Sequence, residues 1–456
     1  MRRLLIQLAG AVLISTLGAA GAAQAKSPAF HPVAGSPFAA PGNPNSLAFG
    51  RQGTLLATTL SQRDAVAVFG VAHNGSLRQV PGSPFATGRS PQSVAFSPNG
   101  QLLATADIYG DSVSVFSVGP GGGLTPVPGS PFAAGSSPSS LAFSPDGGLL
   151  AVTDFGGNNV SVFSVSGSGS LAPIPGSPFD TGSGSLPISV AFAPHGSLLA
   201  VADYGYETVS MYSVASGGVL TPAGGPVATG SGPVSVAFDP TGSKLATANN
   251  ISGTVSIFSV SGPGALKADP GSPYYAGVEP RGVQFSPTGK LLGVASSASN
   301  KAFVYAVAGD GALTPVSGSP FGTGGDPFGL AFSPAGGLFA TPDFTGNGIS
   351  VFAPAPVHLG LAVAPRRPRA RAGQTVAQRL TVTATAPIDR AEVCVTSTAG
   401  LRITSARGAH RRAGRYCWSI AKLGPGQGHG LALKAAIDPG DPGGKLRLRY
   451  VATAAA

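Results

Sequence analysis

The sequence predicts an all-β protein: a seven-bladed β-propeller closed by its N-terminal strand, followed by a small β-sandwich. Two observations predict the propeller. Three short motifs recur seven times each, and the segments between them alternate apolar and polar residues. A third observation predicts the second domain, because the repeat stops near residue 355 and the chain then becomes strongly basic. We therefore expect a signal peptide at 1–25, the propeller at 26–355 and the sandwich at 356–456.

The composition is typical of a folded, turn-rich protein. The 456 residues include 68 Gly and 42 Pro, which is a high share for a globular chain. Disordered chains combine such a content with low hydrophobicity and high charge, whereas here 43% of residues are hydrophobic and 10% are charged. The Gly and Pro must then lie in regularly placed turns, as an all-β repeat protein requires.

The strongest signal is the repeat itself. A Gly-Ser-Pro-Phe motif, or a close variant of it, begins at Gly35, Gly82, Gly129, Gly176, Gly224, Gly271 and Gly318, a spacing of 47 or 48 residues. An Ala-Phe-Ser-Pro-x-Gly motif and a Val-Ser-Val-Phe motif recur at the same spacing. This period is typical of propeller blades of four strands.

The second repeat illustrates the four strands of a blade. We expect strands at 93–96, 102–106, 113–116 and 124–127, because each segment alternates and is bounded by turn residues. The recurring Phe and Leu side chains are expected to pack blade against blade. These positions are therefore assigned to the core.

The order of the motifs indicates how the ring closes. The chain begins with a Gly-Ser-Pro-Phe strand, Phe30 to Phe38, whereas the last repeat ends at Phe352 without one. We expect the segment from Phe30 to Val33 to pair beside Ile349 to Phe352 and supply the missing outer strand. Such pairing removes the open edge that a ring would otherwise leave.

The N-terminus has the features of a secretory signal peptide. Arg2 and Arg3 precede an apolar run from Leu4 to Leu17, and Ala23-Gln24-Ala25 is typical of a cleavage site. An uncleaved membrane anchor is the alternative, although the run is short and interrupted by polar residues. Either way we expect a secreted or extracytoplasmic protein associated with the cell envelope.

The repeated motifs also carry a family resemblance. Gly-Ser-Pro-Phe-Ala-Thr-Gly, Val-Ala-Phe-Ser-Pro-Asn-Gly and Val-Ser-Val-Phe-Ser-Val resemble the bacterial lactonase-like seven-bladed propellers, which include 6-phosphogluconolactonase-type enzymes, and the related surface-layer propellers with Tyr-Val-Thr-Asn repeats. The resemblance covers about residues 26–355. It implies a catalytic site with a Pro-Arg-His stretch and a later Asn-Glu pair. Because fold does not fix function, it does not by itself imply activity.

The matching stretch retains only part of that site. Arg281 matches, but Gly282 stands where the enzymes carry His, and Ser296 and Ser297 stand where they carry Asn-Glu. A lactonase needs a group that activates water and a charge that holds the oxyanion. Arg281 alone supplies the charge; the alternative is a rim arginine in solvent. His195, the one histidine deep in the repeat, occupies a turn, so we assign no catalytic residue.

A polar position at the end of the second strand of each repeat is a candidate ligand site. Its occupants are Leu60, Asp107, Asp154, Asp203, Asn249, Ser296 and Asp343. Equivalent positions form a ring in a propeller, so Asp107, Asp154, Asp203, Asn249 and Asp343, together with Arg281, are candidate binding residues for a cation or a polyhydroxylated ligand. The alternative is a set of side chains that stabilise their own turns. Neighbouring Tyr109, Phe155, Tyr204 and Phe344 suit sugar or peptide binding, or simply cover blade edges.

The C-terminal region differs in charge and pattern. From Val357 onward 16 Lys and Arg face 4 Asp and Glu, whereas residues 26–356 carry 10 and 14. About six strands in about 100 residues predict a sandwich, and its Gly-Gln-Thr-Val and Leu-Gly-Pro-Gly-Gln segments resemble immunoglobulin-like bacterial surface modules. Cys394 and Cys417, the only cysteines, are expected to form a disulfide in an exported protein.

These features favour a non-enzymatic protein that binds a small molecule, glycan or protein at one propeller face. The arginine-rich run at 366–371 is expected either to dock on an anionic envelope polymer or to form a solvated edge. The alternative function is a secreted lactonase-type hydrolase with a degenerate site. We expect a monomer with no cofactor, no metal and no nucleic-acid partner.

Overall fold

The computed structural model describes residues 4–5, 30–262, 264–354 and, beyond residue 358, the strands named below with Ala409. The chain divides into two compact units, Pro28–Pro354 and a second unit of Met1–Ser27 with Ala355–Ala456. Most of the predicted signal peptide lies outside the described residues; its Leu4–Leu5 forms strand β1, which pairs with β38 (Arg369–Ala370). None of the described residues form a helix with the length and apolar character that a membrane span requires.

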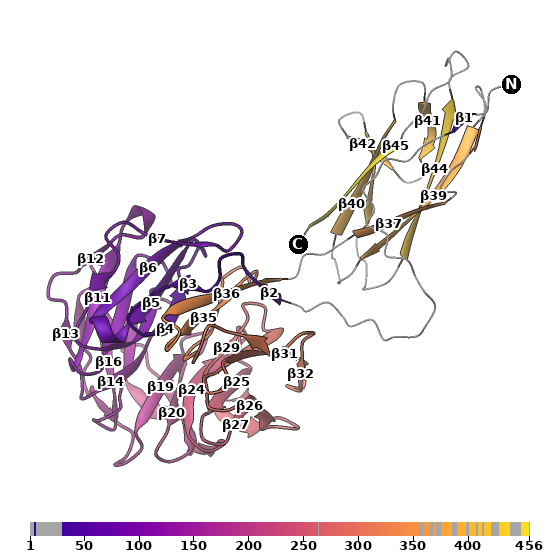
Figure 1. Ribbon diagram of the computed structural model, residues 1–456. Helices are drawn as coiled ribbons and strands as arrows, with labels where there is room; N and C mark the ends of the chain where they lie inside the picture. Colours follow the sequence, from indigo (N-terminus) through magenta and orange to yellow (C-terminus); the bar gives the residue numbers. More distant parts are fainter. Residues whose placement is uncertain are drawn as a thin grey trace. The chain divides into compact units, whose positions relative to one another are not determined.

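Seven antiparallel sheets follow one another around the first unit, which confirms the predicted seven-bladed propeller (Figure 1). The innermost strands are β4 (Pro44–Phe49), β9 (Pro91–Phe96), β14 (Pro138–Phe143), β19 (Pro187–Phe192), β24 (Pro233–Phe238), β29 (Pro280–Phe285) and β34 (Ala331–Phe332). The second strands are β5 (Leu55–Leu60), β10 (Leu102–Asp107), β15 (Leu149–Asp154), β20 (Leu198–Asp203), β25 (Lys244–Asn249), β30 (Leu291–Ser296) and β35 (Phe339–Asp343). The third strands are β6 (Ala65–Val71), β11 (Ser112–Val118), β16 (Asn159–Val165), β21 (Thr208–Val214), β26 (Thr254–Ser261), β31 (Lys301–Val307) and β36 (Gly348–Pro354).

The outer edge of each blade holds two short strands rather than the single strand expected. The first set is β7 (Leu77–Gln79), β12 (Leu124–Pro126), β17 (Leu171–Pro173), β22 (Leu220–Pro222), β27 (Ala265–Ala268), β32 (Leu313–Pro315) and β2 (Phe30–Pro32). The second set is β8 (Phe85–Ala86), β13 (Phe132–Ala133), β18 (Phe179–Asp180), β23 (Val227–Ala228), β28 (Tyr274–Tyr275), β33 (Phe321–Gly322) and β3 (Phe38–Ala39). In blade 2 both strands pair with β11, and the Pro-Gly and Pro residues between them interrupt the ladder because proline donates no hydrogen bond.

The last blade joins the two ends of the propeller segment. Phe30 of β2 lies opposite Pro354 of β36, and Pro32 lies opposite Phe352. The Val33 N–H then donates to Val351 O at 2.8 Å. The strand from Phe30 to Pro32 therefore faces the end of β36, whereas Ile349 lies opposite Phe38 of β3.

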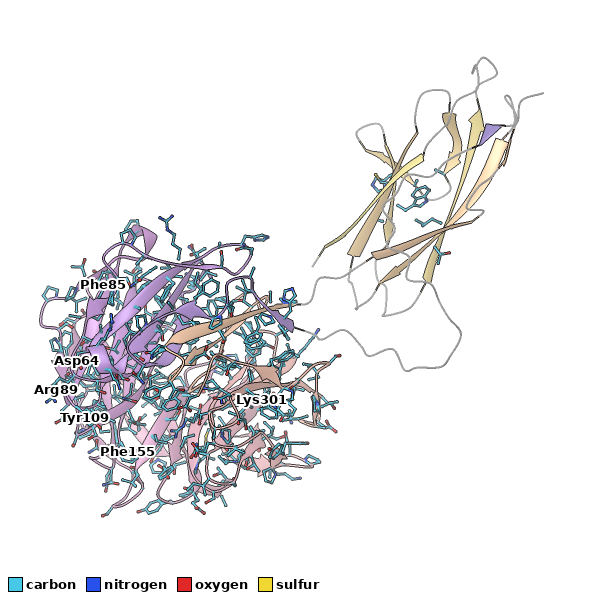
Figure 2. All side chains as sticks on the ribbon, in the orientation of Figure 1. Asp64, Phe85, Arg89, Tyr109, Phe155 and Lys301 are labelled. Carbon is cyan, nitrogen blue, oxygen red and sulfur yellow. The ribbon has the colours of Figure 1, made fainter. Side chains whose placement is uncertain are left out.

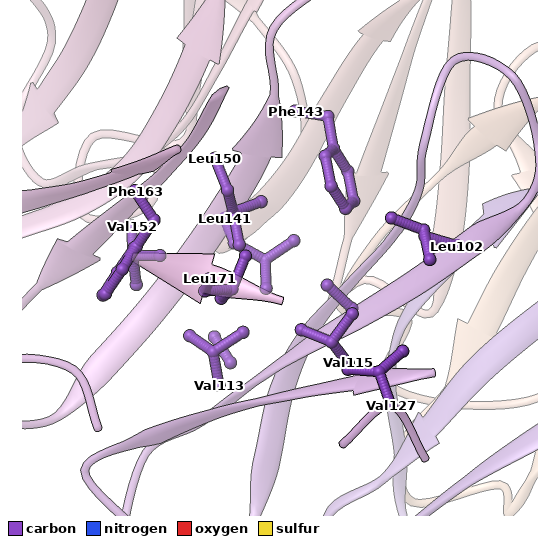
Figure 3. Packing of buried hydrophobic residues seen from close by; sticks show 12 residues of the cluster. Leu102, Val113, Val115, Val127, Leu141, Phe143, Leu150, Val152, Phe163 and Leu171 are labelled. Carbon is purple, nitrogen blue, oxygen red and sulfur yellow. The ribbon is translucent and has the colours of Figure 1, made fainter. Parts of the chain in front are cut away.

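Apolar side chains between neighbouring blades form the core. Figure 3 shows the cluster between blades 2 and 3, where Leu102 and Val115 of one blade approach Leu141 and Leu150 of the next. Burying one such side chain contributes about 1.5–3 kcal/mol. Because the recurring Val, Leu and Phe positions form such a cluster at each junction between blades, the repeat motif is above all a packing motif.

Hydrogen bonds across the blades reinforce the ring near the start of the inner strands. A serine Oγ of one blade accepts from a backbone N–H of the next in the pairs Ser46–Val94, Ser93–Leu141, Ser140–Val190, Ser189–Val236 and Ser235–Val283, at 3.1–3.4 Å. Blades 6 and 7 carry Gly282 and Gly329 instead. There the Phe332 N–H donates to Gln284 Oε1 at 2.7 Å. A glutamine thus replaces serine as the acceptor at the junction between blades 6 and 7.

The second unit contains two four-stranded sheets. Their orders are β37-β39-β44-β41 and β42-β43-β40-β45. The strands are β37 (Leu359–Ala364), β39 (Thr375–Ala384), β40 (Arg390–Ser397), β41 (Leu401–Ala406), β42 (His410–Arg412), β43 (Arg415–Ile420), β44 (Gly428–Ile437) and β45 (Leu448–Ala455). About six strands were expected, and the described residues of these two sheets form eight. Cys394 lies directly opposite Cys417 in the β40–β43 ladder.

Candidate functional site

Each inner strand is preceded or begun by a buried proline, and the residue after that proline is half-buried. The seven residues are Asn45, Gln92, Ser139, Ile188, Val234, Arg281 and Phe328. Because they occupy equivalent positions, they form a ring at one end of the propeller, which we call the Arg281 face. One arc of this ring is polar, and the Asn45 side-chain amide donates to Gln92 Oε1. Arg281 and Phe328 follow on blades 6 and 7, so Phe328 borders Asn45 where the ring closes.

Neighbouring groups hold Arg281 in place. Its Nε donates to Ser297 Oγ at 3.1 Å, and its Nη2 lies 3.4 Å from Glu279 Oε2. The guanidinium carbon lies 4.4 Å from the ring centroid of Phe328, a cation–π distance. The Phe328 ring in turn stacks on Phe344 at 4.3 Å with an interplanar angle of 2°. With 36% of its side chain exposed, the fixed cation remains accessible to a ligand.

Glu279 was not among the predicted site residues. The residue before the inner proline has a left-handed φ in every blade, namely Asn43, Ser90, Ser137, Leu186, Gly232, Glu279 and Asp326. This shared geometry places each of these residues beside the ring position that follows. The signal that would have found Glu279 is its place directly before Pro280, because the carboxylate stands two residues from Arg281.

The loop that carries Glu279 lacks an anchor that other blades have. In five junctions an Asp or Asn just before the preceding third strand accepts from a loop N–H, as Asp64 accepts from Ser90 at 2.7 Å; the others are Asp111, Asn158, Asn300 and Asn347. The equivalent residue before Arg281 is Gly253, and Val278 N–H instead donates to Ser299 Oγ at 2.8 Å. The repeat is therefore altered beside Arg281 as well as at Gly282.

Position 282, where the resemblance implies a catalytic histidine, has no room for a side chain. A Cβ on Gly282 would lie 2.7 Å from Cα of Gly329, which is closer than side chains approach backbone. Ser296 Oγ is occupied as a donor to Val278 O at 2.7 Å. His195 lies in the turn after β19, at the other end of that inner strand. Among the described residues, Arg281 therefore has a carboxylate and a serine beside it but no histidine.

The predicted polar ring consists of internal blade residues. Asp107, Asp154, Asp203, Asn249 and Asp343 are each 0% exposed, and each bonds to a serine seven residues later, such as Ser114 for Asp107 at 2.7 Å. The two blades without Asp or Asn lack the serine as well, with Leu60 and Ala67 in blade 1 and Ser296 and Phe303 in blade 6. This paired variation favours a structural role inside the blade over a ligand-binding ring. The bonds join the second and third strands of a blade, whereas the sequence-based alternative had each side chain stabilise its own turn.

The surroundings of the four aspartate carboxyl groups differ at one position, two residues before each aspartate. In blades 2 and 7 a threonine hydroxyl donates to the second carboxylate oxygen, as Thr105 does to Asp107 at 2.8 Å. In blades 3 and 4 Val152 and Val201 occupy that position, and Oδ1 of Asp154 and of Asp203 has no partner. Burial raises the pKa of all four above the ordinary 3.8. The pKa values are about 6 for Asp107 and Asp343, and about 7 for Asp154 and Asp203.

No group of three or more His, Cys, Asp or Glu residues within the described part of the chain is arranged to hold a metal ion. Five large apolar side chains are exposed at this end of the propeller. Tyr109, Tyr206, Ile251, Tyr275 and Val278 are 45–69% exposed. Figure 2 labels Tyr109, Phe155 and Arg89 along one edge of the propeller in this view.

Comparisons with known proteins agree with this fold. The family described as lactonase, 7-bladed beta-propeller, matches residues 33–186, which run from the end of β2 to just before β19. The propeller is lactonase-like. A Bacteroides fragilis protein assigned as a 6-phosphogluconolactonase is 22% identical to this lactonase-like chain, with a TM-score of 0.57 over 63% of this chain and 86% of that one.

Two further solved structures share the fold. The periplasmic gluconolactonase of Pseudomonas aeruginosa is 22% identical, with a TM-score of 0.53 over 61% of this chain and 86% of its own. A streptogramin B lyase is 12% identical, with a TM-score of 0.53 over 73% of this chain and all of its own. At these identities the similarity shows the lactonase-like fold alone. A comparison with curated proteins found no match.

Proposed function

We propose that this lactonase-like propeller is an exported, non-enzymatic binding protein of the cell envelope, and that the Arg281 face holds an anionic ligand. The observation that carries the proposal is the setting of Arg281. Its guanidinium is fixed by Ser297 and Phe328 yet remains 36% exposed. A fixed and accessible guanidinium suits a carboxylate or phosphate, because arginine presents several donors in one plane.

The rest of the ring supplies what a hydroxylated ligand needs. Asn45, Gln92 and Ser139 offer amide and hydroxyl groups, and Phe328 offers an aromatic face. Hydrolysis would also require a group that activates water beside the substrate. The backbone of Gly329 occupies the space that a histidine at position 282 would need. The proposal therefore assigns recognition, and not turnover, to this face.

The proposal extends to the whole chain. Arg2, Arg3 and the apolar run after them support export, and pairing of the first strand with β36 supports a ring closed in solution. Two four-stranded sheets in about 100 residues support an immunoglobulin-like sandwich, and facing Cys394 and Cys417 support a disulfide within it. The excess of arginine there suits an anionic envelope polymer. The propeller is proposed to act as a monomer.

Calorimetric titration with 6-phosphogluconate tests the binding site. We expect saturable binding that is at least tenfold tighter than binding of glucose, and at least tenfold weaker in Arg281→Gln. Arg89→Gln is the matched control, because Arg89 lies on a loop of the same face but outside the ring. Equal binding by wild type and Arg281→Gln would remove Arg281 from the site.

A lactonase-type hydrolase with a degenerate site is the second candidate. The observation in its favour is Glu279 Oε2, which lies 3.4 Å from both Arg281 Nη2 and Ser297 Oγ. A carboxylate there is placed to accept a proton from water while Arg281 holds an oxyanion. A rate assay with lactones distinguishes the two candidates.

A further inference from the structure

The end of the propeller opposite the Arg281 face carries a ring of proline and glycine residues. In each Ser-Pro-x-Gly turn, or the variant of it that a blade carries, the glycine has a left-handed φ and faces the turn of the preceding blade. A Cβ on this glycine would lie 3.3–3.8 Å from the Cδ of the preceding proline in six junctions: Gly147–Pro98, Gly196–Pro145, Gly242–Pro194, Gly289–Pro240, Gly336–Pro287 and Gly53–Pro334. The seventh junction differs, because Gly100 faces the Cβ of Arg51 at 3.4 Å.

Blade 1 replaces the Ser-Pro of this turn by Gly50-Arg51 without changing the turn. Gly53 N–H donates to Gly50 O at 2.8 Å, as Gly100 N–H donates to Ser97 O at 2.8 Å in blade 2. The backbone therefore does not require an arginine at position 51. Arg51 is exposed, and no carboxylate of the described residues forms an ion pair with it.

A second departure lies beside Arg51. Position 70 of the third strand is Gly, where the other blades carry Ser117, Ser164, Ser213, Ser259, Ala306 and Ala353. A Cβ on Gly70 would meet only Arg78 O at 3.7 Å, an ordinary contact, so packing does not demand the glycine. Because Gly70 has no side chain, space stays open between the first two blades.

A cavity of about 520 Å³ occupies that space. Its volume is within the range of small-molecule sites. Its chemistry is carried by Arg51, Gln52, Thr54, Asn99, Phe96 and Leu55, with no acidic residue among the lining. Gly50 lacks the hydroxyl with which Ser97 holds Asn99 Oδ1 at 2.7 Å, so no such bond fixes Gln52. One cation, two amides, a hydroxyl and an aromatic face thus converge.

We propose that this cavity is a second ligand site, separate from the Arg281 face, for a small acidic saccharide. Arg51 binds the carboxylate, because a guanidinium pairs with a carboxylate through two parallel hydrogen bonds. Gln52, Asn99 and Thr54 bind hydroxyl groups, and Phe96 covers one face of the sugar ring. Three departures from the repeat, Gly50, Arg51 and Gly70, converge here although none is needed for folding.

Titration of the full chain with glucuronate, with calorimetry as the readout, tests this site. We expect saturable binding that Arg51→Pro, which restores the residue of the other blades, weakens at least tenfold. Gly70→Ser should also weaken it by filling the cavity. Arg89→Gln should bind glucuronate as wild type does, because Arg89 lies on a loop at the other end of the propeller. Glucose should bind at least tenfold more weakly.

Thermal unfolding of the variants accompanies the titration. Arg51→Pro should melt no lower than wild type, because proline fits the second position of this turn in the other blades. If it melts lower, Arg51→Gln replaces it in the comparison. Unchanged glucuronate binding in the Arg51 variants, equal binding of glucose, no binding by wild type, or binding of inorganic phosphate in place of glucuronate would each overturn the proposal.

Discussion

Gly282 and Gly329 are packed so closely that a Cβ on Gly282 would lie 2.7 Å from Cα of Gly329. This contact joins the inner strands of blades 6 and 7 at the level where the other blades use a serine to bridge the junction. Lactonase-type enzymes are expected to carry histidine at the position of Gly282. The close approach of these two strands therefore leaves no room for a histidine at position 282.

Gly282→Ala should destabilise the propeller by about 1–3 kcal/mol, because a methyl group there forces the two strands apart. Chemical denaturation measures the change in the free energy of unfolding. Gly337→Ala is the control, since a Cβ at Gly337 meets nothing within 4 Å and its φ is not left-handed. If both substitutions were equally tolerated, Gly329 would not close the space beside Gly282.

The stability of the propeller should decrease as the pH rises from about 4 to 7. Burial raises the pKa of Asp154 and Asp203 in the folded state to about 7, whereas the ordinary value is 3.8. The folded state then holds protons that the unfolded state releases, so its advantage is complete below about pH 4 and is lost as the pH passes 7. Denaturation curves at pH 4.5, 6 and 8 measure this trend.

Val152→Thr should weaken that pH dependence. The new hydroxyl would donate to the unpartnered Oδ1 of Asp154, as Thr105 does for Asp107, whose pKa is about 6. A fall of about one pKa unit corresponds to about 1.4 kcal/mol of added stability at pH 8. Val201→Thr should act likewise on Asp203. If the free energy of unfolding of the variant changed with pH between 6 and 8 as that of wild type does, the missing hydroxyl would not explain why the pKa of Asp154 is higher than that of Asp107.

Blade 5 holds a buried ion pair where other blades hold two apolar residues. Lys244 Nζ lies 2.6 Å from Asp269 Oδ2, and their side chains are 14% and 3% exposed. Lys244→Leu or Asp269→Val alone should cost about 3–5 kcal/mol, because each leaves a buried charge unpaired. The double variant restores the pair that Leu102 and Val127 form in blade 2, and its stability should equal or exceed that of wild type. A double variant as unstable as the single ones would contradict this reading.

The disulfide prediction concerns the second unit only. Cys394 and Cys417 face each other across β40 and β43, and closing a loop of this size typically contributes about 3 kcal/mol. Reduction of the full chain should lower the melting temperature of one transition while the propeller, which has no cysteine, keeps its own. Labelling of two thiols in the native, non-reduced protein would show that no bond forms.

The sequence was sufficient for the propeller because every blade repeats the same packing positions. Leu103, Val115 and Phe116, for example, belong to the recurring apolar positions that were assigned to the core, and all are buried. The split of the outer strand was not predictable in the same way. It depends on how Pro131 and its neighbours interrupt the ladder to β11, which is a matter of local backbone geometry rather than alternation.

The candidate site was predictable only at Arg281, which a matching motif identified. Glu279 was missed because its role depends on a left-handed backbone before Pro280 rather than on a motif. The polar ring was recognised from its spacing, but spacing alone could not distinguish a solvent-facing ring from buried side chains bonded to Ser114 and its equivalents. The sequence nevertheless contains the observation that separates these two interpretations. Blade 1 lacks both the Asp and its partner serine, because Leu60 and Ala67 occupy the two positions.

The rate of 6-phosphogluconolactone hydrolysis by the purified protein tests the central claim most directly. The account predicts that the lactone disappears at the uncatalysed rate, while 6-phosphogluconate still binds in the same solution and Arg281→Gln removes that binding. Turnover well above the uncatalysed rate that is abolished by Arg281→Ala or Glu279→Gln would contradict the account and identify the Arg281 face as an active site.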